Sequence, residues 1–203
     1  MYFYLRTLPF CIFAPMLEKN EIIQSALRNL KIEELNPMQE ASLEQATGRK
    51  DVILLSPTGS GKTLAYLLPL LLTLKPNDDS VQVLILVPSR ELALQIDSVF
   101  KAMGTSWKTC CCYGGHPIAE EKKSILSNHP AIIIGTPGRI TDHLSKGNFN
   151  PETIETLIID EFDKSLEFGF HDEMAEIITQ LPGLKNVCYF QLLMRQRFPN
   201  LQD

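Results

Sequence analysis

The residues best suited to chemistry lie at positions 56–63, which read Ser-Pro-Thr-Gly-Ser-Gly-Lys-Thr. Glycine at two of these positions allows backbone angles that other residues avoid, so successive N–H groups can turn inward around an anion. Lys62 adds a positive charge, and the hydroxyl of Thr63 can bind a divalent cation. The pattern therefore predicts a loop that binds the phosphates of a nucleotide. Its predicted binding residues are Thr58, Gly59, Ser60, Gly61, Lys62 and Thr63.

The segments on either side of this loop support the interpretation. The apolar run at residues 52–55 predicts a short buried strand, and leucines between positions 64 and 71 recur at helical spacing. The positive end of that helix would face the same anion. The usual pattern has Gly where this chain has Ser56. A glycine-rich loop with a chance Lys-Thr pair is the alternative, and the flanking strand and helix make it the weaker one.

An acidic pair follows another buried strand pattern at residues 157–159. Asp160 comes directly after this strand, where its carboxylate could hold Mg²⁺ opposite Thr63. Glu161 could orient or deprotonate the water that attacks the nucleotide. We therefore predict Lys62, Asp160 and Glu161 as catalytic residues, with Thr63 and Asp160 as the metal ligands. The alternative is a solvated acidic turn at the end of a strand.

The elements that position these residues alternate between strand and helix patterns. Predicted strands cover residues 52–55, 81–87, 108–113, 131–134, 157–159 and 187–190. Predicted helices begin after Asn20, at Pro37, behind the phosphate loop, after Ser89, at 117, at 136–139 and near 172. This alternation predicts an α/β fold, a mostly parallel sheet with helices on both faces. Ligands of such sheets bind at the carboxyl ends of the strands, where the polar motifs of this chain lie.

Composition limits the possible functions. The chain has 203 residues, 44% of them hydrophobic, which suits one globular α/β domain. No apolar run is long enough to cross a bilayer, so we expect no membrane partner. The net charge of −5 argues against a broad basic face for nucleic acid, so any such contact must be local. We expect a cytoplasmic protein, with residues 1–15 as an extension of uncertain origin.

Three of the five cysteines are consecutive, at positions 110–112. Their spacing is neither that of a zinc site nor that of a disulfide framework. Adjacent residues of a strand point to opposite faces, so the whole run should not converge on one metal ion. We therefore expect reduced cysteines that act as small apolar side chains.

Five motifs together resemble the first RecA-like domain of the DEAD-box ATP-dependent RNA helicases. They lie, in order, at residues 57–63, 88–93, 114–115, 136–139 and 160–163. The resemblance covers about residues 16–190 and implies a RecA-like P-loop NTPase domain that uses ATP and Mg²⁺. It implies ATP hydrolysis coupled to local opening of RNA duplexes as the activity of the parent protein.

The resemblance also implies two sets of binding residues. Gln39 falls at the glutamine that reads adenine, and a side-chain amide can pair with both the amino group and a ring nitrogen of that base. The residues assigned to the RNA backbone are Pro88, Arg90, Gly115, Thr136 and Arg139. Contacts of this kind carry little sequence information. For Arg90, a surface salt bridge is the alternative.

Some positions depart from the family pattern. Asn36 stands where the family has Thr, Phe162 replaces a small residue, and the upstream aromatic that stacks on adenine is not identified. Residues 191–203 do not resemble the family, and a second RecA-like domain is not found. We therefore expect the isolated chain to bind nucleotide weakly and to hydrolyse it slowly. The alternatives are a non-catalytic nucleotide- or RNA-binding module and a DNA helicase or nuclease subunit of the same superfamily.

Overall fold

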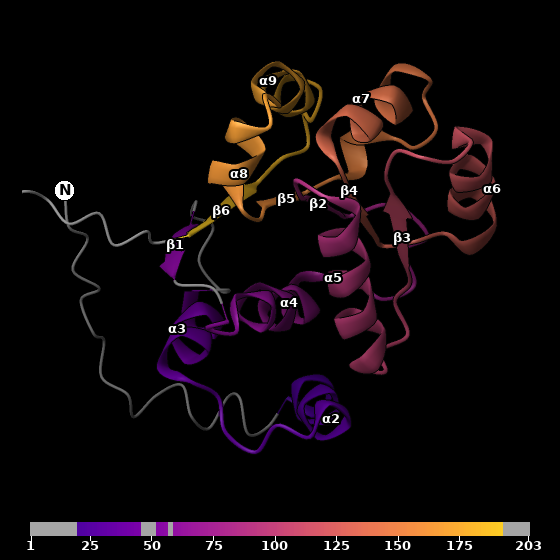
Figure 1. The fold of residues 1–203 in the computed structure, drawn as a ribbon. Helices are drawn as coiled ribbons and strands as arrows, with labels where there is room; N and C mark the ends of the chain where they lie inside the picture. Colours follow the sequence, from indigo (N-terminus) through magenta and orange to yellow (C-terminus); the bar gives the residue numbers. More distant parts are fainter. Residues whose placement is uncertain (1–19, 46–51, 57–58, 193–203) are drawn as a thin grey trace, which may run out of the picture.

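The computed structural model describes residues 20–45, 52–56 and 59–192 (Figure 1). In these residues, six strands form one sheet in the order β1-β6-β5-β2-β4-β3. Every neighbouring pair is parallel, which confirms the predicted α/β class. The strands are β1 (Val52–Ser56), β2 (Val83–Leu86), β3 (Thr109–Cys112), β4 (Ile132–Gly135), β5 (Thr156–Ile159) and β6 (Asn186–Leu192).

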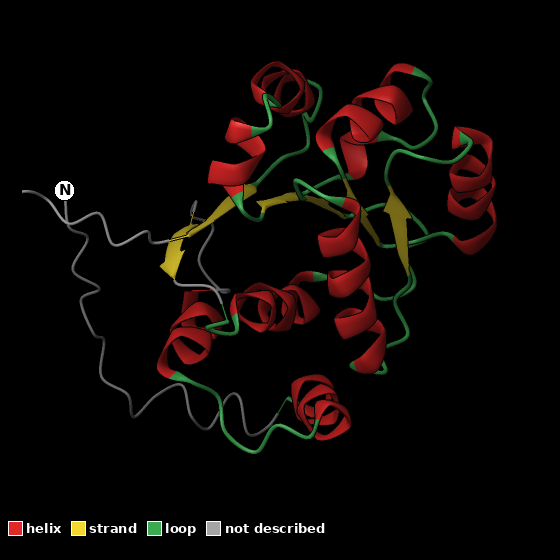
Figure 2. Cartoon of the chain, viewed as in Figure 1, coloured by secondary structure: helices red, strands yellow, loops and turns green. Residues whose placement is uncertain are grey.

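Helices cover both faces of this sheet, with α2 to α5 on one side and α7 to α9 on the other (Figures 1 and 2). The described helices are α2 (Glu21–Leu30), α3 (Pro37–Gln45), α4 (Lys62–Thr73), α5 (Arg90–Ala102), α6 (Ile118–Asn128), α7 (Pro137–Ser145), α8 (Phe162–Glu167) and α9 (His171–Thr179), with a 3₁₀ turn at Pro151–Thr153. None of the helices in the described part of the chain combines the length and the apolarity that a bilayer crossing requires.

The central strands are buried on both faces, as the continuous aliphatic runs predict. In β2, Val83 and Ile85 belong to the core under α2, α4 and α5, whereas Leu84 and Leu86 belong to the opposite core. This alternation follows from the two-residue period of a strand. The sheet therefore separates two hydrophobic cores, and the carboxyl ends of its parallel strands lie in one row.

Local capping signals place several helices as expected. The side chain of Asn20 accepts hydrogen bonds from the N–H groups of Ile22 and Ile23 at the start of α2. Ser89 caps α5 in the same way, by accepting from Leu92 N. The sequence also predicts that the helix starting at Pro37 ends near Gly48, a position that lies outside the described residues.

Two elements differ from the sequence prediction. No helix was predicted between the strand at 157–159 and the helix near 172, but the chain turns at Glu161, which has φ 49°, and starts the short helix α8 at Phe162. A helix of six residues is too short to show a clear apolar period, so the pattern gave no sign of it. Strand β6 continues to Leu192, two residues beyond the predicted limit, and pairs there with β1.

Candidate functional site

The predicted phosphate loop connects β1 to α4, as expected. Gly59 and Gly61 have φ of 77° and 84°, a left-handed conformation that favours glycine. A Cβ atom on Gly61 would also lie 2.5 Å from the side-chain nitrogen of Gln39. Lys62 is buried in the first turn of α4, whose N-terminus has no side-chain cap. Thr58, another predicted binding residue, lies outside the described residues.

Asp160 is buried close to this loop, within reach of the charge of Lys62. One carboxylate oxygen accepts from the hydroxyl of Tyr66 at 3.0 Å, and the other accepts from Glu161 N at 2.9 Å. Burial raises the pKa of the Asp160 carboxyl, and the Tyr66 hydrogen bond and the charge of Lys62 oppose this shift. The site therefore holds a desolvated carboxylate within the influence of the loop lysine.

Tyr66 also connects the two predicted metal ligands. Burial and the neighbouring Asp160 raise the pKa of its phenol, whereas a hydrogen bond with the Thr63 side chain lowers it. Thr63 and Asp160 therefore both lie near the Tyr66 hydroxyl, although they come from α4 and from the end of β5. Sequence reasoning missed Tyr66, because a tyrosine within an apolar helix pattern reads as a core residue.

The predicted water-orienting residue, Glu161, follows Asp160 directly. Its carboxylate accepts from Lys164 Nζ at 2.9 Å, one turn further along α8. This ion pair raises the pKa of Lys164, with the hydrogen bond as its main cause. Since both side chains remain partly exposed, the pair is open to exchange with solvent or ligand.

Two amide side chains tie α3 to the phosphate loop. Gln39 is buried, accepts from Asn36 N at 3.0 Å and donates to the carbonyl oxygen of Gly61 at 3.2 Å. The side-chain nitrogen of Asn36 donates to the carbonyl oxygen of Ser60 at 2.9 Å, while its oxygen caps α3. Asn36 was known from the sequence only as a departure from the family pattern, and its contact with the loop was not predicted.

The predicted RNA-binding residues gather at the carboxyl ends of β2, β4 and β3, which are neighbours in the sheet. Pro88 is buried after β2, and the exposed Arg90 stacks its guanidinium over the Tyr113 ring at 5.0 Å. In the part of the chain that the structure describes, no ion pair is recorded for Arg90. Gly115 has φ 100°, and Thr136 precedes α7.

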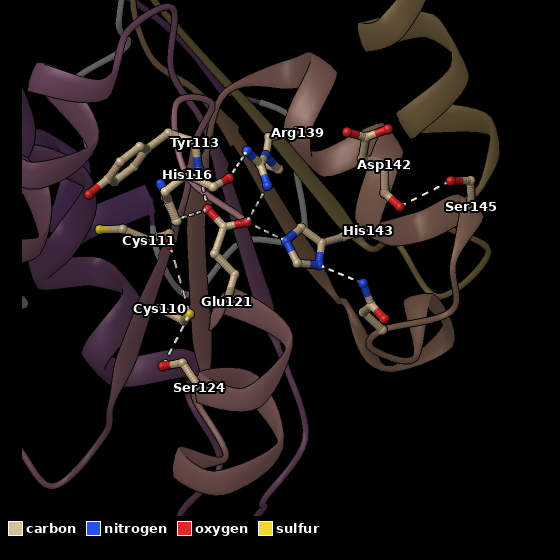
Figure 3. Close-up of polar contacts among 11 residues, drawn as sticks. Cys110, Cys111, Tyr113, His116, Glu121, Ser124, Arg139, Asp142, His143 and Ser145 are labelled. Atoms are coloured by element: carbon tan, nitrogen blue, oxygen red, sulfur yellow. Dashed lines mark hydrogen bonds and ion pairs between the residues drawn. The ribbon is translucent and has the colours of Figure 1, made fainter. Parts of the chain in front are cut away.

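Arg139 differs from Arg90, because its guanidinium points into the protein (Figure 3). One nitrogen lies 3.3 Å from a carboxylate oxygen of Glu121, and another donates to the carbonyl oxygen of His116 at 2.8 Å. The side chain is only 11% exposed. The structure therefore brings Arg139 to the predicted surface but places its charge beneath that surface.

Glu121, on α6, collects four donors around one buried carboxylate (Figure 3). One oxygen accepts from Tyr113 N at 2.8 Å and lies 2.9 Å from His116 Nε2. The other lies 2.7 Å from His143 Nε2 and close to Arg139. The sequence gave no sign of this role, because an acidic residue in the first turn of a helix is ordinarily an exposed partner of the helix dipole.

Cys112 lies beside this cluster, and its sulfur, a Glu121 oxygen and a His143 nitrogen fall within 4.8 Å of one another. Both Glu121 oxygens already accept hydrogen bonds, however, and one adjoins a guanidinium. A hydrogen bond with Cys110 and burial raise the pKa of the Cys112 thiol, which disfavours the thiolate that metals bind. The group is therefore a hydrogen-bonded cluster. As the strand alternation predicts, Cys111 faces the opposite core.

The sequence matches the sequence model of the DEAD/DEAH box helicase family over residues 36–194. It is 36% identical over 170 residues to the DEAD-box ATP-dependent RNA helicase RhpA of Helicobacter pylori (strain B128), a match that covers 83% of this chain and 34% of RhpA. It is also 36% identical over 186 residues to the ATP-dependent RNA helicase DRS1 of Candida glabrata, covering 88% of this chain and 26% of DRS1.

Solved structures give the same result for the fold. A DEAD box protein from the hyperthermophile Methanococcus jannaschii superposes with a TM-score of 0.80 at 29% identity, covering 86% of this chain and 48% of that chain. A hypothetical ATP-dependent RNA helicase from Sulfolobus tokodaii gives a TM-score of 0.77 at 31% identity, with 85% and 50% covered. The predicted RecA-like fold is thereby confirmed. The chain spans about a third of the length of RhpA.

Proposed function

The chain belongs to the DEAD/DEAH box helicase family, and we propose that it forms the ATP-binding domain of an ATP-dependent RNA helicase. The observation that carries this proposal is the hydrogen bond between Asp160 and Tyr66 on α4, the helix that begins with Lys62 and Thr63, with the charge of Lys62 acting on the same carboxylate. A hydroxyl, a carboxylate and a lysine at the start of a helix are the groups that a nucleotide with Mg²⁺ requires.

The residues present fit such a ligand. Asp160 is buried with two neutral donors, so its carboxylate keeps capacity for a cation. In this proposal, Thr63 and Asp160 hold Mg²⁺, while Lys62 and the N–H groups of the loop hold the phosphates. When bound, Mg²⁺ offsets the charge that develops on the phosphates during transfer. Glu161 positions the attacking water. Because Lys164 already donates to the Glu161 carboxylate, this carboxylate must then accept from both the lysine and the water.

We propose that adenine is read by Gln39. Its amide presently bonds the loop and the start of α3, so base recognition requires it to exchange at least one of these contacts. This would couple base recognition to the conformation of the phosphate loop, because the same amide serves both.

We propose RNA as the second ligand, bound through its backbone along the ends of β2, β4 and β3. Support comes from the common location of Pro88, Arg90, Gly115, Thr136 and Arg139. The relatives RhpA and DRS1 are named as RNA helicases, which favours RNA over DNA. Binding of RNA and DNA oligomers of the same sequence, measured side by side, tests this choice, and equal affinity would favour the alternative of a DNA helicase.

Hydrolysis is proposed to need a second RecA-like domain. An added arginine commonly accelerates phosphoryl transfer by several orders of magnitude. The charges that act most strongly on Asp160 come from Lys62 and Glu161, neither of which is an arginine. We therefore expect slow turnover by this chain alone, and strong RNA-stimulated hydrolysis by it would contradict this part of the proposal.

Titration of the chain with a fluorescent ATP analogue in the presence of Mg²⁺ tests the nucleotide site. Lys62→Ala should weaken binding by about tenfold or more, because one charge–phosphate contact is worth at least ~1.4 kcal/mol. Lys101→Ala is the matched control, since Lys101 is an exposed lysine paired with Asp97 on α5. Equal binding by the Lys62→Ala variant and the unaltered chain would remove the phosphate-loop assignment.

A further inference from the structure

The position of Arg139 bears on how the proposed RNA surface works. Its guanidinium bonds Glu121 on α6 and the carbonyl oxygen of His116 in the turn after β3. Both contacts lie beneath the row of strand ends, and the side chain is nearly enclosed (Figure 3). To reach a phosphate, Arg139 would have to leave a buried carboxylate without its cation, which is strongly destabilising.

Glu121 also holds the turn after β3, which runs from Tyr113 to His116. It accepts from the backbone N–H of Tyr113, at the start of the turn, and from the ring of His116, at its end. The exposed residues Gly114 and Gly115 lie between these two anchors. One carboxylate therefore sets the conformation of the whole turn.

The same carboxylate also holds α7. His143 lies 2.7 Å from Glu121, and the amide nitrogen of Asn148 lies 3.0 Å from the other ring nitrogen. Since an amide nitrogen only donates, Nδ1 accepts and Nε2 carries the hydrogen that Glu121 receives. Arg139 and His143, on successive turns of α7, thus dock the start of this helix against the glycine turn.

We propose that Glu121 and Arg139 are positioning residues for RNA, acting as one unit that aligns the turn at Gly114 and Gly115 with the N-terminus of α7. The phosphates are then bound by backbone N–H groups of these two segments and by Arg90, while the Arg139 guanidinium stays inside. This inference rests on the proposed RNA-binding function and changes the role expected for Arg139 from a direct contact to an indirect one.

The first test compares two changes to glutamine in the full chain. Glu121→Gln keeps an acceptor for Tyr113 N but removes the carboxylate oxygen that faces Arg139, and Arg139→Gln removes the other partner. Each should weaken binding of a single-stranded RNA oligomer, followed by fluorescence anisotropy, by about tenfold. The double variant should be no weaker than either single variant, because both changes break one unit. Additive losses would overturn the proposal.

The second test uses the dependence of binding on salt. The logarithm of the affinity falls linearly with the logarithm of the salt concentration. Removing a direct phosphate contact should make this slope less steep by about 0.7 for single-stranded RNA. We expect this reduction for Arg90→Gln, whose side chain is exposed. Glu121→Gln and Arg139→Gln should lower the affinity at an unchanged slope. A reduced slope for Arg139→Gln would identify it as a direct contact and overturn the inference.

Two controls separate the possible failures. Thermal unfolding should occur at a lower temperature in both glutamine variants, because each change leaves one partner of a buried ion pair alone, so RNA binding is measured well below the unfolding transition. Binding of the ATP analogue at that temperature should stay near the value of the unaltered chain, which shows that the variants are folded and that the loss is specific to RNA. Arg139→Lys keeps the charge but not the paired nitrogens, so it should fail to restore RNA binding; full rescue by lysine would contradict the positioning role. If the unaltered chain binds no RNA, the proposed function itself fails at this surface, and the inference with it.

Discussion

Two buried carboxylates, Asp160 and Glu121, lie at opposite parts of the same row of strand ends and have opposite surroundings. Each is 3% exposed. Asp160 accepts from one phenol and one backbone N–H, and burial raises its pKa. Glu121 accepts from a backbone N–H and lies against two imidazoles and a guanidinium. Asp160 therefore has two neutral donors and the charge of Lys62 near it, whereas Glu121 has four hydrogen-bonding partners, one of them a guanidinium.

This difference distinguishes the proposed metal ligand, Asp160, from a carboxylate that supports the fold. A buried carboxylate without a directly bonded cation is costly, and it gains most when a ligand brings one. The surroundings of Asp160 are therefore suited to a ligand that carries a divalent ion, at the expense of stability in its absence. Those of Glu121 are suited to holding two loops in one arrangement. Stability and ligand binding should respond in opposite ways at the two positions.

The largest effect on stability is expected at Glu121. Glu121→Ala leaves Arg139 buried without its partner, so the free energy of unfolding should fall by about 3–5 kcal/mol. Urea unfolding of the purified chain measures this loss. Glu120→Ala, at the exposed neighbouring position of α6, is the control and should stay within about 0.5 kcal/mol of the unaltered chain. Similar values for the two variants would mean that the four contacts of Glu121 contribute little.

Asp160→Asn should give the reverse result. Loss of the desolvated charge offsets the loss of one hydrogen bond, so the free energy of unfolding should change by less than about 1 kcal/mol. Binding of the ATP analogue should lose its dependence on Mg²⁺, weakening by about tenfold, or ~1.4 kcal/mol. The exposed Asp172 supplies the control variant, Asp172→Asn. If Mg²⁺ still strengthens binding to Asp160→Asn, this carboxylate is not the metal ligand.

The strand–helix alternation was sufficient to predict the fold, because long-range order in a parallel sheet follows from the order of the elements. The positions of Lys62, Thr63 and Asp160 could likewise be predicted, since they flank well-marked strands and helices. Tyr66 could not, because its role depends on a contact between residues 94 positions apart. Helix α8 was also missed, because too few residues carry its pattern.

The inward orientation of Arg139 could not be predicted for a similar reason. The sequence shows a Thr-Pro-Gly-Arg start of a helix, which places the arginine near an anion-binding end. Which way the guanidinium points is decided by Glu121, a residue of a different helix whose burial no local pattern reveals. A motif can thus predict where a helix begins without predicting which way its side chains point. Arg90 and Arg139 illustrate this, because both belong to predicted motifs, yet one guanidinium is exposed and the other is turned inward.

The pH dependence of stability should also report the burial of Asp160. The pKa of Asp160 is raised above its ordinary value of 3.8 in the folded chain, so the folded chain binds a proton at this carboxyl more tightly than the unfolded chain does. The free energy of unfolding therefore gains a contribution from this group as the pH falls through the raised pKa, and the contribution is complete below pH 3.8. The difference in free energy of unfolding between the unaltered chain and Asp160→Asn should move in favour of the unaltered chain on acidification. A difference that is constant with pH, measured by urea unfolding, would contradict the raised pKa.

The smallest effect is expected at the other end of the nucleotide site, where Asn36 holds the phosphate loop. Asn36→Asp preserves the oxygen that caps α3 but replaces the nitrogen that donates to Ser60 with a second acceptor. The loop should lose one tether worth ~1 kcal/mol, so binding of the ATP analogue should weaken about fivefold while α3 keeps its cap. Asn20→Asp, which also keeps a helix cap but lies away from the loop, is the matched control. Tighter binding by Asn36→Asp would contradict this prediction. It would mean that Asn36 and Gln39 hold the phosphate loop in a closed form, and that a nucleotide must break their contacts with the loop before it can bind.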